Sequence, residues 1–102
     1  MNEILTYFRS IDTDSNCDLY HGDKGTKLYG HFRTLDGTVD LTIDAEGTCT
    51  TEYKTTVLVK GKVVAKYTTA VSEDWKTTIA ACVYDHYAAL QIDADAAQYN
   101  NN

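Results

Sequence analysis

The chain contains no proline and only six glycines in 102 residues. No linker composition, internal repeat or low-complexity tract divides it, so we expect residues 1–102 to form a single domain. No run of about 18 apolar residues is present, which argues against a membrane-spanning helix. The amino-terminal residues also lack the basic start and apolar stretch of a signal peptide. We therefore expect a cytoplasmic protein that does not engage a membrane.

Cysteine and basic residues are also scarce. The three cysteines, Cys17, Cys49 and Cys82, are an odd number without an export signal, which favours reduced thiols over disulfides. Nine basic residues against fifteen acids give a net charge of -6, which disfavours direct nucleic-acid binding. The acids gather at the ends, since residues 1–23 and 70–102 each carry five acids against one base. Residues 24–69 carry seven bases against five acids.

Local patterns predict an α+β fold with an N-terminal helix, a four-stranded antiparallel sheet made of two hairpins, and a C-terminal amphipathic helix on one sheet face. Near the start, Asn2 can cap a short helix in which Ile4, Leu5 and Phe8 share a side. This helix should end before the acidic stretch that begins at Asp12.

The first hairpin is predicted over residues 27–44, where Asp36-Gly37 is a typical type I′ turn dipeptide between two alternating segments. A two-residue loop at this position fixes the pairing of the strands. The expected pairs are Leu35 with Thr38, Thr34 with Val39, Arg33 with Asp40, Phe32 with Leu41, and Gly30 with Ile43.

The second hairpin is predicted over residues 51–69, with its turn near Lys60-Gly61. A two-residue loop pairs Val59 with Lys62. A three-residue loop instead pairs Val57 with Val63 and Tyr53 with Tyr67, which is the more amphipathic arrangement. That register also sets two lysines opposite each other, so both alternatives stay open.

The C-terminal helix is predicted to start at an N-cap Ser72 and to run at least to Gln91. At 100° per residue, one side of this helix is apolar enough to cover the sheet. The residues on it are Trp75, Ile79, Cys82, Val83, His86 and Leu90. Residues 99–102 form a polar tail that we expect to fray.

An acidic loop follows the first predicted helix. Its oxygen-bearing residues repeat as in an EF-hand, where alternate side chains converge on calcium. They are Asp12, Asp14, Asn16 and Asp18, with Asp23 at the twelfth position. Over residues 8–23 the chain therefore resembles a calcium loop, although Cys17 replaces its turn glycine and Asp23 is shorter than its closing glutamate. The alternative is a solvated loop of Asx turns, and the size of the domain requires no cofactor for stability.

Other reactive side chains admit structural interpretations. The pairs Cys17/His21 and Cys82/His86 have zinc-ligand types, but neither has the usual knuckle spacing. A cysteine nucleophile, Cys49 or Cys82, could pair with a histidine, yet no catalytic motif places them together, so we expect no enzyme. Four lysines on the second hairpin could grip a single nucleic-acid strand, but they are more typical of a protected edge strand.

The acidic ends suggest a binding function. The carboxylates proposed to meet a partner are Asp12, Asp14, Asp18 and Asp23 near one end, and Asp74, Asp85, Asp93 and Asp95 near the other. If the terminal elements are neighbours, these groups form a negative surface that steers toward a basic cleft. In size and charge the chain resembles small acidic phage proteins of the anti-restriction and anti-CRISPR type, which occupy nucleic-acid sites of enzymes. The alternative is that these acids only keep the protein soluble.

The expected function is therefore an inhibitor or adaptor that docks on a larger basic protein, such as a nucleic-acid enzyme. Exposed tyrosines would add to that interface, because tyrosine is enriched in binding sites. The candidates are Tyr7, Tyr20, Tyr84, Tyr87 and Tyr99. Two alternatives remain: a calcium-binding module built on residues 12–23, and a small acidic secretion-type chaperone, which would be expected to dimerise.

Overall fold

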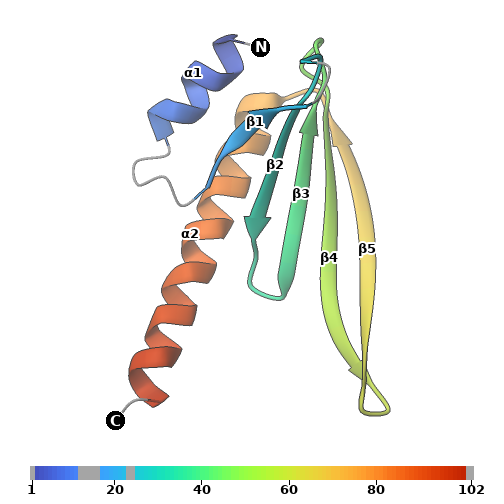
Figure 1. Ribbon diagram of the computed structural model, residues 1–102, viewed down its shortest axis with the longest axis vertical. Helices are drawn as coiled ribbons and strands as arrows, with labels where there is room; N and C mark the ends of the chain where they lie inside the picture. Colours follow the sequence, from blue (N-terminus) through green and yellow to red (C-terminus); the bar gives the residue numbers. More distant parts are fainter. Residues whose placement is uncertain (1, 12–16, 23–24, 101–102) are drawn as a thin grey trace.

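Two helices and one antiparallel sheet make up the protein (Figure 1). The structure, a computed structural model, describes residues 2–11, 17–22 and 25–100. The elements in chain order are α1 (Asn2–Ile11), β1 (Leu19–His21), β2 (Leu28–Arg33), β3 (Gly37–Ile43), β4 (Cys49–Val59), β5 (Lys62–Ser72) and α2 (Trp75–Asn100). The strands lie in the sheet in the order β1-β2-β3-β4-β5. The predicted α+β class is confirmed.

The prediction of four strands is wrong, because the sheet has five. The additional strand, β1, pairs antiparallel with β2 and forms one edge of the sheet. It has only three residues, of which Leu19 alone is buried. A strand this short shows no alternating pattern in the sequence, and polar residues precede it.

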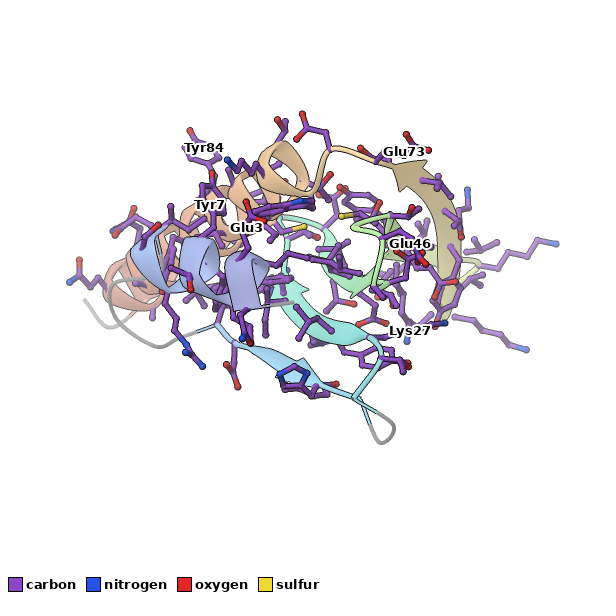
Figure 2. All side chains as sticks on the ribbon, turned by 90° about the horizontal axis from the view of Figure 1, so that it is seen from above. Glu3, Tyr7, Lys27, Glu46, Glu73 and Tyr84 are labelled. Carbon is purple, nitrogen blue, oxygen red and sulfur yellow. The ribbon has the colours of Figure 1, made fainter. Side chains whose placement is uncertain are left out.

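The hydrophobic core lies between the sheet and the two helices. Seen from above, the sheet is curved and both helices are on its concave side (Figure 2). The largest fully buried side chains are Leu28, Phe32, Val39, Leu41, Ile43, Cys49 and Ile79. α1 adds Ile4, Leu5 and Phe8, which confirms the predicted apolar side of this helix. Burial of one such side chain stabilises the fold by roughly 1.5–3 kcal/mol.

The turn between β2 and β3 is formed by Leu35-Asp36 and not by the predicted Asp36-Gly37. The N–H of Thr34 donates to the Gly37 carbonyl oxygen at 3.0 Å, which closes a two-residue loop. Gly37 has a different role, because a Cβ at this position would lie 1.8 Å from the carbonyl oxygen of Lys54. The glycine is therefore needed where the backbone of β4 approaches β3.

This turn shifts the register of the first hairpin. The observed pairs are Phe32 with Val39, Gly30 with Leu41 and Leu28 with Ile43, and on the other face Arg33 with Thr38, His31 with Asp40 and Tyr29 with Thr42. The predicted pairs of Phe32 with Leu41 and of Arg33 with Asp40 are wrong. The two faces keep their predicted residues because the shift preserves the alternation of side chains. The observed register also gives Leu28 a cross-strand partner in the core.

The second hairpin has the two-residue loop Lys60-Gly61, and Val59 pairs with Lys62. Both loop residues have positive φ angles, 52° and 79°, as a type I′ turn requires. Of the two predicted registers, the structure therefore has the less amphipathic one. It avoids the like-charge pair, because Lys54 lies opposite Tyr67 and its Nζ is 5.7 Å from the ring centroid.

α2 is capped by Asp74, so the prediction that Ser72 is the N-cap is wrong. Asp74 Oδ1 accepts the N–H of Thr77 at 3.2 Å, and Oδ2 accepts the Thr77 hydroxyl at 2.7 Å. Ser72 is still the last residue of β5, and its hydroxyl accepts the N–H of Asp74. The observed N-cap therefore lies two residues beyond the predicted one, because β5 is longer than predicted.

The predicted apolar side of α2 covers the sheet. Ile79, Cys82, Val83 and His86 are buried, and Trp75 packs partly buried against the core. The helix continues to Asn100, which is within the segment expected to fray. No described helix is both long and apolar enough to cross a membrane.

The β4–β5 hairpin and the C-terminal half of α2 extend as two arms beyond the β2–β3 turn (Figure 1). The last pair between β3 and β4 joins Gly37 and Thr55, so β4 and β5 continue past it as a two-stranded ribbon. On the other arm, residues 91–98 of α2 are exposed. The arms leave side chains of both elements open to solvent.

Candidate functional site

A groove of about 390 Å³ lies where the two arms meet the β2–β3 turn. Its walls are Thr34, Leu35, Asp36 and Thr38 of the hairpin, Tyr53, Lys54 and Thr55 of β4, and Tyr84, Asp85, Ala88 and Ile92 of α2. Three large side chains around it are strongly exposed: Leu35 by 60%, Tyr84 by 74% and Ile92 by 53%. The groove thus combines a concave shape with apolar side chains that the fold itself does not bury.

Helix geometry explains the α2 wall of the groove. Asp85, Ala88 and Ile92 follow at spacings of three and four residues, which places them on one side of a helix. These three residues lie roughly 100–160° around the helix from the buried His86, because successive residues of a helix with 3.6 residues per turn are about 100° apart. Tyr84 projects outward from the same helix (Figure 2). The buried side therefore fixes α2 on the sheet while this adjacent side stays available.

The wall on β4 presents a neutral phenol. Burial, followed by the neighbouring Cys82 and Asp85, raises the pKa of Tyr53. The phenol therefore keeps its proton at neutral pH and can act as a hydrogen-bond donor. A carboxylate on the helix and a phenol on the strand thus line the same groove.

The predicted acids of α2 differ in what they already contact. Asp85 lines the groove, whereas the Asp93 carboxylate is 3.5 Å from Nε of Arg33. Asp95 accepts a hydrogen bond from the Gln91 amide at 3.0 Å. Asp74 serves as the helix cap, and its hydrogen bonds with Thr77 lower its pKa. Asp85 and Asp95 are therefore the predicted acids best placed to meet a partner at this helix.

The terminal elements are neighbours, since α1 packs on α2 with the Tyr7 and Trp75 rings 5.5 Å apart. Beyond α1, Cys17 Sγ lies 3.8 Å from the Tyr87 hydroxyl, and the next residue, Asp18, is exposed. Tyr87 and Asp85 are two positions apart on α2 and so lie on opposite sides of it. Asp18 and the groove therefore belong to different sides of the helix.

The remaining predicted acids lie outside the described residues. They are Asp12, Asp14 and Asp23, together with Asn16 of the proposed calcium loop. Their part in a negative surface, and the calcium site itself, stay predictions. Within residues 2–11, 17–22 and 25–100, no group of three or more His, Cys, Asp or Glu side chains is placed to hold a metal ion.

His86, Cys49 and Cys82, which were considered for zinc binding or catalysis, are buried in the fold. His86 is buried, and its Nδ1 accepts the backbone N–H of Arg33 at 2.8 Å. Burial, with a smaller effect of Asp85, raises the pKa of Cys82 to about 12. Burial also raises the pKa of Cys49. Both thiols are therefore neutral at neutral pH, whereas a nucleophile or metal ligand must be a thiolate.

The tyrosines proposed for an interface fall into two groups. Tyr84 and Tyr20 are exposed by 74% and 54%, whereas Tyr7 and Tyr87 pack partly buried against the core. Tyr99 has no described side chain. Sequence reasoning did not predict the groove, because its walls come from three separate segments. The one signal was the pair Ala88 and Ile92, which continues an apolar side beyond the predicted buried one.

No protein-family model, curated protein or solved structure matches this chain. A function can therefore be argued only from the chemistry of the residues and their arrangement.

Proposed function

We propose that the protein is a small acidic binding protein, an inhibitor or adaptor, which docks on a larger basic protein through the groove beside α2. One observation carries this proposal: exposed apolar side chains and a carboxylate border the same hollow. Leu35, Tyr84 and Ile92 remain open to solvent around it, and Asp85 lines it.

The residue types indicate what the groove would bind. Large aromatic and aliphatic side chains in a concave site act as anchors of protein interfaces. Asp85 lies in the groove, Asp95 lies further along the same helix, and Lys76 is the one lysine or arginine in α2. A partner segment with an apolar side chain flanked by lysine or arginine would fill the hollow and meet these carboxylates.

The negative net charge of the protein supports a basic partner. At a net charge of -6, the protein is attracted over long range to positive clefts and repelled by nucleic acid itself. Positive clefts are typical of enzymes that handle nucleic acids. We therefore favour an inhibitor of such an enzyme, of the anti-restriction or anti-CRISPR type.

Affinity capture at low salt, followed by a salt gradient, tests the proposal. Columns would carry the wild-type protein, Tyr84→Ala, Asp85→Asn, and the control Glu46→Gln, which changes an exposed acid outside the groove. We expect one basic protein to bind the wild-type and control columns, to elute at moderate salt, and to be lost from the two groove variants. Equal recovery on all four columns, or recovery on none, would contradict the proposal.

A further inference from the structure

β5 forms an exposed edge of the sheet opposite β1. It is 11 residues long, and every residue from Lys62 to Val71 is exposed. Its three most exposed large apolar side chains, Val63, Tyr67 and Val71, are 69%, 63% and 68% exposed and recur at every fourth residue on one face of the strand. A long apolar edge of this kind pairs readily with another strand unless something covers it.

The register of the hairpin shows which backbone groups are available at this edge. Because a two-residue loop closes on a hydrogen-bonded pair, Lys62 bonds Val59, and the even-numbered residues of β5 follow it in bonding β4. The odd-numbered residues from Val63 to Val71 therefore direct their N–H and C=O groups away from β4. These groups lie on the free side of β5.

We propose that two copies of this chain associate through antiparallel pairing of β5 with β5, about a two-fold axis at Tyr67. About this residue each valine of β5 meets a valine or an alanine, and lysines at the hairpin turn come beside acids that follow the strand, which favours a second copy over an unrelated strand. The pairs across the interface would be Tyr67 with Tyr67, Lys66 with Thr68, Ala65 with Thr69, Val64 with Ala70, Val63 with Val71, and Lys62 with Ser72. Each odd-numbered residue then donates one hydrogen bond and accepts one.

Charge is also complementary in this register. The lysines at the hairpin turn, Lys60 and Lys62, come beside the acids Glu73 and Asp74, which follow β5 in the second copy. Figure 2 shows Glu73 directly beyond the end of this strand. The one like-charge contact is diagonal, between the two Lys66 side chains, and their flexible stems can carry the ammonium groups into solvent.

Neighbouring registers are less favourable. An axis at Lys66 would place the two Lys66 side chains directly opposite each other, which destabilises a strand pair. An axis at Thr68 would place Val63 opposite Glu73. Of these three registers, only the axis at Tyr67 places all three valines of β5 opposite valine or alanine. The resulting dimer covers both β5 edges, and it leaves the groove beside α2 outside the interface, so it is independent of the proposed docking function.

Sedimentation velocity across a concentration series tests the association. We expect the wild-type mass to rise from 11.4 kDa to twice that value with concentration in the micromolar range. Thr69→Pro should stay monomeric, because proline removes an outward N–H while the even-numbered bonds to β4 remain. Thr69→Ala is the matched control and should dimerise. Circular dichroism would confirm that each variant is folded.

A charge exchange tests the register without altering the backbone. Lys62→Glu should weaken dimerisation roughly tenfold, and adding Glu73→Lys should restore it. A wild-type protein that stays at 11.4 kDa at all concentrations would overturn the proposal. So would a Thr69→Pro variant that dimerises as the wild type does. Failure of the charge exchange to restore the dimer would overturn the register at Tyr67.

Discussion

Individual residues in this protein have roles that depend on backbone contacts as much as on side-chain chemistry. Gly37 illustrates this, since it starts β3 at the point where the Lys54 carbonyl approaches most closely. Gly61 is favoured for its backbone conformation, because its φ angle of 79° belongs to the left-handed region. No atom lies close to its Cβ position, so a side chain there would meet no steric clash. The two positions should therefore respond differently to the same substitution.

Replacing Gly37 by alanine should destabilise the fold by about 3 kcal/mol or more, because the new methyl group would collide with backbone that cannot move freely. Gly61→Ala, the matched control, should cost about 1 kcal/mol, since only the unfavourable φ angle opposes it. Urea denaturation of both variants measures the difference. Equal losses of unfolding free energy would contradict the close approach of β3 and β4.

The stability of the protein should fall at high pH because of Cys82. Its pKa rises from the ordinary value of 9.0 to about 12 in the folded state. The unfolded chain thus releases this proton near pH 9, while the folded chain keeps it. The contribution of the protonated Cys82 thiol to the free energy of unfolding is complete below pH 9. It is lost progressively between pH 9 and about 12, at up to roughly 1.4 kcal/mol per pH unit.

Denaturation of the wild type and of Cys82→Ala over this range isolates that contribution from other titrating groups. The wild type should lose stability more steeply than the variant above pH 9. Parallel pH profiles would show that the thiol titrates alike in both states, which would contradict its burial.

At the scale of elements, α2 meets the sheet through polar contacts as well as through the apolar core. Nδ1 of His86 accepts the Arg33 N–H, and the His86 ring meets the Phe32 ring edge to face, with centroids 5.9 Å apart. Arg33 also reaches Asp93 through its guanidinium group. One residue at the end of β2 therefore contacts α2 at two positions, His86 and Asp93, that lie about two turns apart.

Replacing His86 by phenylalanine keeps a ring but removes the acceptor. Because the Arg33 N–H would then lack this partner in a partly buried place, we expect a loss of about 1–3 kcal/mol in unfolding free energy. Hydrogen exchange at the Arg33 amide should accelerate as well. An Asp93→Asn control should have a smaller effect, since that ion pair is more exposed. Unchanged exchange at Arg33 would contradict the role given to His86.

Elements with a strong local pattern were predictable from sequence, and their exact registers were less so. The apolar sides of α1 and α2 and the two hairpins were identified because their periodicity is clear. The register of the first hairpin was not predicted correctly, because Asp36-Gly37 has the composition of a turn. The glycine is needed at this position because the backbone of the neighbouring strand β4 approaches it closely. That contact is tertiary, and no local pattern encodes it.

The same limit applies to the site. Asp85 was predicted as a contact from charge alone, and Tyr84 from residue type. Their meeting with Leu35 and Tyr53 depends on how α2 crosses the sheet, which sequence spacing does not determine. Asp74 and Asp93 were also predicted contacts, but a helix cap and an ion pair engage them.

At the scale of the whole molecule, charge is divided between the two arms. The β4–β5 hairpin carries four lysines, Lys54, Lys60, Lys62 and Lys66, whereas the exposed acids of α2 belong to the other arm. This division allows each arm its own partner. The proposed basic partner would meet the acidic helix and its groove, and the proposed second copy would meet the hairpin edge.

Hydrogen exchange of the protein with and without its captured partner tests the central claim most directly, namely that the groove beside α2 is the docking site. Binding should slow exchange in residues 34–36 at the β2–β3 turn and in residues 84–92 of α2, and it should leave β1 unchanged. Slowed exchange confined to β1 and β2, with no change in residues 84–92, would contradict the assignment of this groove.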